Sequence, residues 1–549
     1  MKDRIAQLIR QAAAEAQKRG LLPEVTLPEI IIERPQISDH GDYASSLPLK
    51  LARSAHIDPY TIAQNLAGLV PPSAEIEKVV AARPGYINFI LKGDWLAHQV
   101  DTILEQYQSY GDIDLGKKTR VQLEFVSVNP TGPLHVGHGR GAVLGSTLAM
   151  VLSAAGYHVE KEYYINDAGA QIEHFCRSLF CRYQQGLGLP AEMPAEGYVG
   201  SYMVDLAKEI IAEHGDRLSK IAPDKLLAEV GRIGLEKMLA QIKADLEQVG
   251  VVFDLWFNES SLFKGNQYSI VMALLKEKGY IADKEGARWF ASTALGESKD
   301  NVLERSDGTP TYFASDIAYH YNKFVERKFD QVINIWGADH QGHVSRLKAA
   351  VGALGVNPER LKVIITQMVT LRRGEEILKL SKRSGEIITL REVVEEVGPD
   401  ACRFFFLTRS ADSQMDFDLE LAKKQSDDNP VYYVQYAHAR IASILRRAGD
   451  VDYSKGDVSL LTSEPELSLI RYMLRLPEVV ETVASNLEPH HLPYYAQELA
   501  TTFHSFYKQC RVISNDQANT RARLRLVAAA KIVLARTLQL MGINAPEQM

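Results

Sequence analysis

The chain has 549 residues, of which 46% are hydrophobic and 24% are charged, and its formal net charge is −7. A chain of this length needs more than one hydrophobic core, so we expect three or four domains of ordinary soluble composition. The negative net charge argues against non-specific binding of nucleic acid, and no stretch of 18 uncharged apolar residues is present that could cross a membrane.

A first module is expected over residues 1–116. Ile5, Leu8 and Ile9 stand at helical spacing among charged residues, which predicts an amphipathic helix and not a signal peptide. Residues 85–90 alternate in polarity and predict a strand. Together they favour an α+β domain, and the polar segment 112–120 is a plausible linker.

A second module is expected over residues 117–428. Residues 121–126 and 159–164 read as strands, with a helix between them that ends at Gly156. This βαβ order predicts a parallel sheet with a right-handed crossover. A mostly helical, charge-rich stretch over about 166–295 reads as an insertion, after which strand patterns resume at 332–336 and 363–365.

The turn between the first strand and the helix carries His135-Val136-Gly137-His138. A helix N-terminus offers free N–H groups and a positive dipole end to phosphates, and glycine lets a flat adenosine approach the backbone. Further on, Lys379 and Lys382 stand three residues apart in a short loop that can bring ammonium charge to a pyrophosphate. Each motif alone is weak evidence, but the pair favours a nucleotide site.

The last module, residues 429–549, has only helical patterns. Between Phe503 and Arg536 it carries one acid, Asp516, and seven basic residues: Lys508, Arg511, Arg521, Arg523, Arg525, Lys531 and Arg536. Basic residues among aromatic ones suit a single-stranded RNA loop, but without other context a solvated basic helix face over a core is the favoured interpretation.

The four cysteines predict neither a disulfide framework nor a structural zinc site, because no two have C-x-x-C spacing. They are Cys176, Cys181, Cys402 and Cys510. We therefore expect a reduced, cytoplasmic protein.

The two nucleotide motifs and four longer stretches resemble class I aminoacyl-tRNA synthetases, and more narrowly the bacterial-type arginyl-tRNA synthetases. The stretches are residues 124–140, 164–169, 336–340 and 429–440. Val136 departs from the class pattern, which has isoleucine there, as do Leu380 and Arg383 in the lysine motif. The resemblance implies a Rossmann-type parallel-sheet catalytic domain with an insertion, an N-terminal α+β domain that binds the tRNA D-loop, and a C-terminal all-α bundle that binds the anticodon.

The resemblance also implies the chemistry. ATP, accompanied by Mg²⁺ that its phosphates and water hold, activates L-arginine as arginyl-adenylate, and the arginyl group then passes to the 3′ end of tRNA(Arg). His135 and His138 would contact ATP and the transition-state phosphate, Gly137 would make room for the nucleotide, and the lysine motif would stabilise the pyrophosphate. That motif contributes Lys379, Ser381 and Lys382.

For the amino acid, the resemblance implies that carboxylates at Glu124 and Asp316 bind the guanidinium, whose planar fork they match. Asn129 would hold the α-amino group and Tyr312 would line the pocket, with Asp339 and Gln341 near a further polar contact. Without the resemblance, Glu124 reads as a solvent-facing strand residue and Asp316 as an acid at a helix end.

For tRNA, Tyr86 and Asn88 match positions that contact the D-loop, and Tyr436, His438 and Arg440 lie near the start of the anticodon-binding module. The tyrosines there could equally be core residues. The family is monomeric by default and needs tRNA before it activates arginine, and we expect both here.

Three alternatives stay open at this stage. Another class I synthetase would need a thiolate or apolar pocket where Glu124 and Asp316 stand. A non-catalytic tRNA-binding paralogue would have no use for the paired histidines and lysines. A nucleotidyltransferase for small metabolites would not need the modules on either side.

Overall fold

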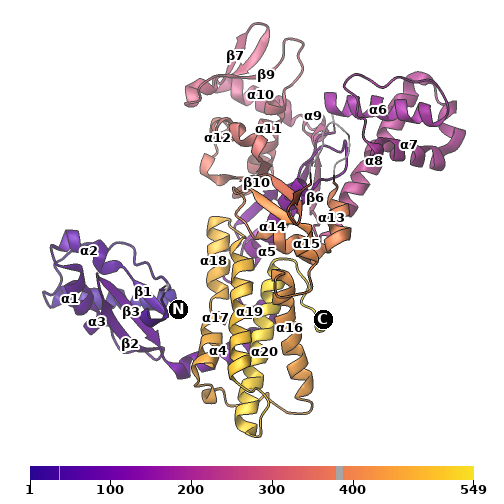
Figure 1. The fold of residues 1–549 in the computed structure, drawn as a ribbon. Coiled ribbons are helices and arrows are strands. Elements are labelled where there is room, and N and C mark those ends of the chain that lie inside the picture. The colour runs from indigo at the N-terminus through magenta and orange to yellow at the C-terminus, as the bar shows by residue number, and fades with distance from the viewer. Residues whose placement is uncertain (36, 168, 379–387) are drawn as a thin grey trace.

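The structure is a computed structural model that describes residues 1–35, 37–167, 169–378 and 388–549. Figure 1 shows an N-terminal domain set to one side, a catalytic region with two outgrowths, and a bundle of long helices below it. In the parts of the chain that the structure describes, no helix is long and apolar enough to span a membrane.

The N-terminal domain combines three helices with a small antiparallel sheet of order β1-β3-β2. Its elements are α1 (Lys2–Lys18), β1 (Tyr43–Ser45), α2 (Leu47–Ala55), α3 (Pro59–Leu69), β2 (Ile76–Ala82) and β3 (Tyr86–Leu91). Ile5, Leu8 and Ile9 are fully buried, as the helical spacing predicts. The α+β character expected from the sequence is confirmed.

Helix α4 (Gly93–Gln106) belongs with the C-terminal bundle and not with this domain. It packs against α17 (Glu464–Met473) and α20 (Gln517–Leu540). Asp101 on α4 forms an ion pair with Arg525 on α20 at 2.6 Å. The compact N-terminal domain therefore ends near Leu91, well before the expected limit at residue 116, because the apolar face of α4 is buried on distant helices.

The catalytic region is built on a parallel sheet of order β11-β10-β4-β5-β6. Its strands are β4 (Arg120–Glu124), β5 (His158–Ile165), β6 (Leu255–Asn258), β10 (Gln331–Gly337) and β11 (Leu361–Thr366). The helix α5 (Val136–Ala154) connects β4 to β5, as the βαβ pattern predicts. Strand order reverses beside β4, so a crevice opens there at the carboxyl ends of β4 and β10, where ligands of such sheets bind.

The stretch expected as one helical insertion is only partly an insertion, because β6 within it extends the central sheet. Before β6 come the helices α6 (Ala170–Gly186), α7 (Ser201–His214) and α8 (Pro223–Gln248). After it, a second outgrowth holds α9 (Ser260–Lys264), α10 (Gln267–Glu277), β7 (Ile281–Lys284), β8 (Ala287–Phe290) and β9 (Asn301–Glu304). A strand of four residues between a helix of 26 residues and a further helical segment is too short to stand out in a sequence pattern.

The chain then returns to β10 through α11 (Tyr312–Tyr321) and a π-helical turn (Asn322–Glu326), and α12 (Val344–Ala353) lies between β10 and β11. A second small sheet, of order β13-β12-β14, and three short helices join it to the bundle. These elements are β12 (Val369–Arg373), β13 (Glu376–Ile377), α13 (Leu390–Val397), α14 (Pro399–Leu407), β14 (Met415–Asp418) and α15 (Leu419–Lys423).

The C-terminal region from α16 (Pro430–Arg447) onward is entirely helical where described, as expected. It adds α17, α18 (Leu476–Asn486), α19 (His491–Gln509) and α20. Four of the seven basic residues noted in the sequence form ion pairs inside the molecule: Arg523 with Glu466, Arg525 with Asp101, Lys531 with Glu547 and Arg536 with Asp112. These four residues therefore join helices and domains of the protein, and they do not form an exposed RNA-binding face.

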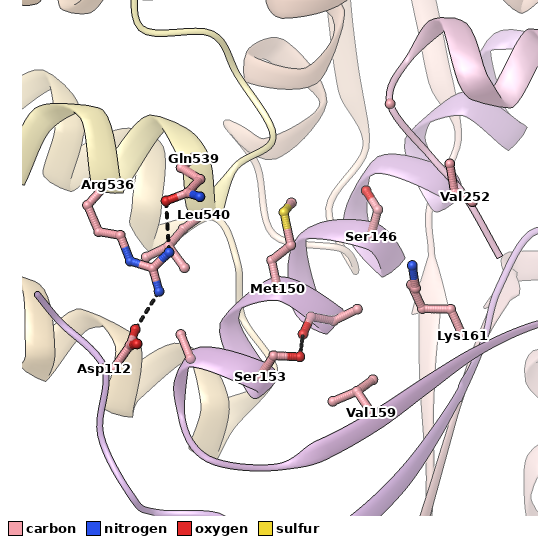
Figure 2. A pocket seen from close by; sticks show the side chains of 13 residues that line it. Asp112, Ser146, Met150, Ser153, Val159, Lys161, Val252, Arg536, Gln539 and Leu540 are labelled. Atoms are coloured by element: carbon pink, nitrogen blue, oxygen red, sulfur yellow. Dashed lines mark hydrogen bonds and ion pairs between the residues drawn. The ribbon is translucent and has the colours of Figure 1, made fainter. Parts of the chain in front are cut away.

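A cavity of about 450 Å³ lies where α5, β5 and α20 meet (Figure 2). Met150 and Val159 give it apolar walls, while the ion pair of Arg536 with Asp112 closes one side. It contains none of the site residues expected from the sequence.

Candidate active site

The first turn of α5 is capped by its own histidines. The Nδ1 atom of His135 accepts a hydrogen bond from the Gly137 N–H at 3.1 Å, and the Nδ1 atom of His138 accepts one from the His135 N–H at 3.3 Å. The two rings stack with centroids 3.5 Å apart. The sequence predicted N–H groups open to phosphate, but these two are already bonded. Glycine favours the fold-back, because a Cβ on residue 137 would lie 3.0 Å from the His135 ring and the ring would have to shift.

This capping fixes the protonation of His138. A nitrogen that accepts a hydrogen bond carries no proton, so Nε2–H is the donor of the neutral ring. Burial and the neighbouring His135 lower the pKa of His138 to about 3, so that the ring stays neutral near pH 7. His138 therefore offers a neutral N–H donor to a phosphate and adds no charge.

The lysine motif, Lys379, Ser381 and Lys382, lies outside the described residues, but the segment that follows it is well placed. Thr389 forms an antiparallel bridge with His135, and the Leu390 N–H donates to the Leu134 carbonyl at 2.7 Å. Thr389, seven residues after Lys382 in the sequence, thus lies directly beside the imidazole pair.

The backbone between β4 and α5 is strained. Val126 and Ser127 adopt φ values of +69° and +45°, a region that side chains with a β-branch rarely enter. Two bonds from β5 hold this conformation: the Tyr163 hydroxyl donates to the Val128 carbonyl at 2.7 Å, and the Tyr164 N–H donates to the Ser127 hydroxyl at 3.1 Å. The resulting bend presents residues 126–133 at the carboxyl edge of the sheet.

The residues expected to bind arginine come from three elements around this edge. Glu124 ends β4, and Tyr312 and Asp316 lie one turn apart on α11. Asn129 lies on the strained loop and donates to Gln171, while Tyr312 is exposed and its hydroxyl lies near Gly169. Gln341 and Asp339 are exposed in the turn that follows β10, on the other side of the crevice.

The electrostatics of this pocket are strongly acidic. Burial, together with Glu124 and Glu259, raises the pKa of Asp316 to about 7. Burial also raises the pKa of Tyr164, and four carboxylates around it add to the rise: Glu259, Asp316, Glu124 and Asp167. Such a concentration of carboxylates is suited to a cationic ligand.

Glu259 and Asp167 were not among the residues picked from the sequence. Glu259 is buried, and hydrogen bonds from Ser315 and Tyr164 oppose the rise in its pKa that burial causes. Asp167 accepts hydrogen bonds from the Ser260 hydroxyl at 2.6 Å and the Ser260 N–H at 2.9 Å. Asp167 lay inside one of the matching stretches, whereas nothing near Glu259 in the sequence marks it.

Lys323 is a further residue that the sequence did not suggest. Its side chain is completely buried, and its Nζ atom lies 2.5 Å from Glu124 and 3.1 Å from the Asn334 side-chain oxygen. It comes from the π-helical turn after α11, a distortion that is common at functional sites. Glu124 is therefore a buried, paired carboxylate and not a solvent-facing strand residue.

The residues expected to contact tRNA lie far from this pocket. Tyr86 and Asn88 are on β3, the central strand of the N-terminal sheet, with Tyr86 partly exposed and Asn88 buried. On α16, the Arg440 guanidinium lies over the rings of Tyr436 and Tyr507, beside a cavity of about 440 Å³ that also receives the C-terminal Met549. His438 is buried, with Nδ1 2.8 Å from the Pro546 carbonyl, so its side chain packs inside the bundle.

Comparison with known proteins gives matches along the whole chain. The family model for the arginyl-tRNA synthetase N-terminal domain matches residues 3–91, the catalytic domain of class I (R) tRNA synthetases matches 99–405, and the DALR anticodon-binding domain matches 434–549. The arginine–tRNA ligase of Dehalococcoides mccartyi strain CBDB1 is 59% identical over 551 residues, which is 100% of this chain and 99% of the relative.

The arginine–tRNA ligase of Carboxydothermus hydrogenoformans is 48% identical over 550 residues, or 99% of this chain and 98% of the relative. The solved arginyl-tRNA synthetase of Thermus thermophilus aligns with a TM-score of 0.79 over 100% of both chains at 24% identity, which supports the fold alone. A paired-histidine turn at a Rossmann-type sheet edge, an acidic pocket beside it, and full-length relatives of one kind lead to one conclusion: the chain belongs to the arginyl-tRNA synthetase family.

Proposed function

We propose that the protein uses ATP to activate L-arginine as arginyl-adenylate and then transfers the arginyl group to the 3′ end of tRNA(Arg). In this proposal the arginine carboxylate attacks the α-phosphorus directly, so the residues position and stabilise charge without forming a covalent intermediate. His135 and His138 donate to the phosphate, and Lys379, Ser381 and Lys382 bind the pyrophosphate that leaves. Mg²⁺ accompanies ATP and is held mainly by phosphate and water oxygens.

Glu124 and Asp316 accept hydrogen bonds from the guanidinium, Asn129 holds the α-amino group, and Tyr312 and Gln341 close the pocket. The acidic surroundings of Asp316 and Tyr164 support this assignment, because a buried excess of carboxylates stabilises a cation and disfavours a neutral side chain.

One observation carries the proposal. The bridge between Thr389 and His135 brings the segment that follows the lysine motif in the sequence to the start of α5, at the same sheet edge where Glu124 and Asp316 lie. Had these groups stood at opposite ends of the sheet, one ATP could not have met both motifs.

For tRNA, we propose that Tyr86 and Asn88 act in the D-loop contact and that Tyr436 and Arg440 act in the anticodon contact. The stacked arrangement of Arg440 between Tyr436 and Tyr507 supports this, since aromatic and guanidinium faces suit unpaired bases. The protein is proposed to act as a monomer.

The deciding experiment is aminoacylation of total tRNA by the purified protein with ATP and each of the twenty amino acids in turn. We expect charging with arginine only. ATP–pyrophosphate exchange with arginine should depend on added tRNA(Arg), and strong exchange without tRNA would contradict that dependence. Charging with another amino acid, or with none, would overturn the proposed function.

A further inference from the structure

The floor of the arginine pocket is a row of polar side chains that crosses three neighbouring strands. Asn334 on β10 stands in register with Glu124 on β4, and Glu124 stands in register with Glu162 on β5. Two cations from one short segment neutralise this row: Lys323 contacts Glu124 and Asn334, and Arg327 pairs with Glu162.

The directions of the hydrogen bonds follow from Lys323. An ammonium only donates, so the Asn334 side-chain oxygen must accept from it, and the Asn334 amide must then donate to His320 Nε2 at 3.0 Å. His320 therefore carries its proton on Nδ1, which donates to the Asp316 carbonyl at 2.7 Å. Burial and Lys323 together lower the pKa of His320, in keeping with a neutral ring.

This chain of contacts joins the two carboxylates that are assigned to the guanidinium. Lys323 holds the side chain of Glu124, while His320 and Asn334 connect the same ammonium to the helix turn that carries Asp316. The Tyr319 ring, 4.0 Å from the ammonium, shields Lys323 on another side. The ammonium is thus contacted by three groups, Glu124, Asn334 and the Tyr319 ring, and the Lys323 side chain has no exposed surface.

We propose that Lys323 is a positioning residue for arginine recognition, a cation built into the protein that holds the Glu124 carboxylate aimed at the substrate. This inference rests on the proposed function. Lys323 occupies only one oxygen of Glu124, leaving the other for the guanidinium. Without the ammonium, the buried carboxylate would lose its charge-assisted hydrogen bond and would no longer be held in one orientation toward the substrate.

Arg327 provides the matched control, because it comes from the same segment and neutralises the same row but contacts Glu162 and Glu160 instead of Glu124. A purely structural role would make the two cations equivalent. The inference makes them different: both substitutions lower stability, but only the loss of Lys323 weakens arginine binding.

The test compares Lys323→Met, Lys323→Ala and Arg327→Met in the full-length protein, using tRNA charging to obtain KM for arginine and for ATP. We expect Lys323→Met to raise the KM for arginine by about 10- to 100-fold, the range for loss of a charge-assisted hydrogen bond, with a change of less than threefold for ATP. Arg327→Met should leave both KM values within threefold. Equal effects on the two KM values, or equal effects of Lys323→Met and Arg327→Met, would overturn the inference.

Chemical rescue gives an independent measurement. Lys323→Ala leaves a space beside Glu124 that ethylammonium or propylammonium can fill, whereas methionine at this position occupies the space without charge. We expect these cations to restore charging by Lys323→Ala and not by Lys323→Met, and neutral propanol to restore neither. No rescue would count against the inference.

Asn334→Asp serves if the Lys323 variants fail to fold, because it keeps the shape of the side chain while competing with Glu124 for the ammonium. It should raise the KM for arginine severalfold, and an unchanged KM would overturn the inference. Should the unsubstituted protein fail to charge arginine, the proposed function falls; if it charges arginine and the variants behave alike, only this inference falls.

Discussion

Asp316 illustrates how a single residue can be tuned by its surroundings for one ligand. With its pKa raised to about 7 by burial and neighbouring carboxylates, it is only partly ionised at neutral pH before a cation arrives. Arg346 offsets part of this repulsion but does not remove it. A bound guanidinium would favour the ionised carboxylate, so that Asp316 would lose its remaining proton when the substrate binds.

Replacing Asp316 by asparagine keeps the shape of the side chain and removes its charge. We expect the KM for arginine to rise about 10- to 100-fold, the range for a hydrogen bond between charged groups, and the KM for ATP to change little. Steady-state charging assays give both values, and Asp283→Asn, an exposed acid on β7, serves as the control. An equal rise in the KM values for arginine and for ATP would mean that Asp316 supports the fold and does not bind the ligand.

The same carboxyl predicts a pH dependence. Because its folded-state pKa lies above the unfolded value, the native state binds a proton that the unfolded state has already released, and the stability this gives is lost as pH rises through about 7. Arginine binds the ionised form and so offsets the loss of stability. The rise in melting temperature caused by arginine should therefore be larger at pH 8 than at pH 6, and Asp316→Asn should abolish the difference.

The binding of ATP should not share this dependence, since His138 stays neutral across that range. A KM for ATP that followed the same pH curve as that for arginine would argue against separate roles for the two groups.

Among the elements, helix α5 depends on two glycines in different ways. A Cβ at Gly145 would lie 2.2 Å from the Phe125 ring, which also packs on Phe253 with centroids 4.4 Å apart, whereas a Cβ at Gly141 would meet nothing within 4 Å. Gly145 lets the helix approach the end of β4. Gly141 has no such packing role, and it only increases the conformational entropy that the backbone loses when the chain folds.

Gly145→Ala should therefore lower stability by about 1–3 kcal/mol through overpacking. Gly141→Ala should raise it by up to about 1 kcal/mol through helix propensity. Thermal unfolding of the two variants beside the unsubstituted protein checks both signs. Destabilisation of similar size in both would show that close packing at Phe125 is not what selects glycine.

Sequence patterns foresaw the regular elements better than the boundaries between domains. The strand–turn–helix around the paired histidines was evident because periodicity, turn residues and Gly156 agreed locally. Helix α4 and strand β6 were misassigned because partners far along the chain decide where each packs. In the site, Glu124 and Asp316 were named only through family resemblance, and Lys323 was missed because one lysine among the charged residues of a helix end carries no pattern.

At the scale of the whole molecule, a buried contact fixes the N-terminal domain to the bundle. Arg34 donates to both carboxylate oxygens of Glu478, at 3.0 and 2.8 Å, and the Tyr43 hydroxyl donates to the same carboxylate at 2.7 Å. Asp42 pairs with Arg471 of the bundle at 2.8 Å. The surfaces proposed for the D-loop and the anticodon are thereby held at a set separation.

Removing Arg34 leaves Glu478 as an unpaired, mostly buried carboxylate, which is costly. We expect Arg34→Met to loosen the domain and raise the KM for tRNA severalfold without changing the KM for arginine. Small-angle scattering should show a larger radius of gyration. Arg19→Met, which removes only an exposed pair within α1, is the control, and an unaltered KM for tRNA in Arg34→Met would count against a role for this contact in tRNA binding.

The imidazole caps on α5 have a consequence for competitors of the nucleotide. A bare helix end attracts any small oxyanion, including inorganic phosphate and sulfate. Here the N–H groups of His135 and Gly137 are already bonded to the two imidazoles, so we expect a loose oxyanion to gain less by arriving alone. A triphosphate that also engages its base and sugar gains much more, and the helix end thus acts as a filter that keeps common inorganic ions from blocking the enzyme.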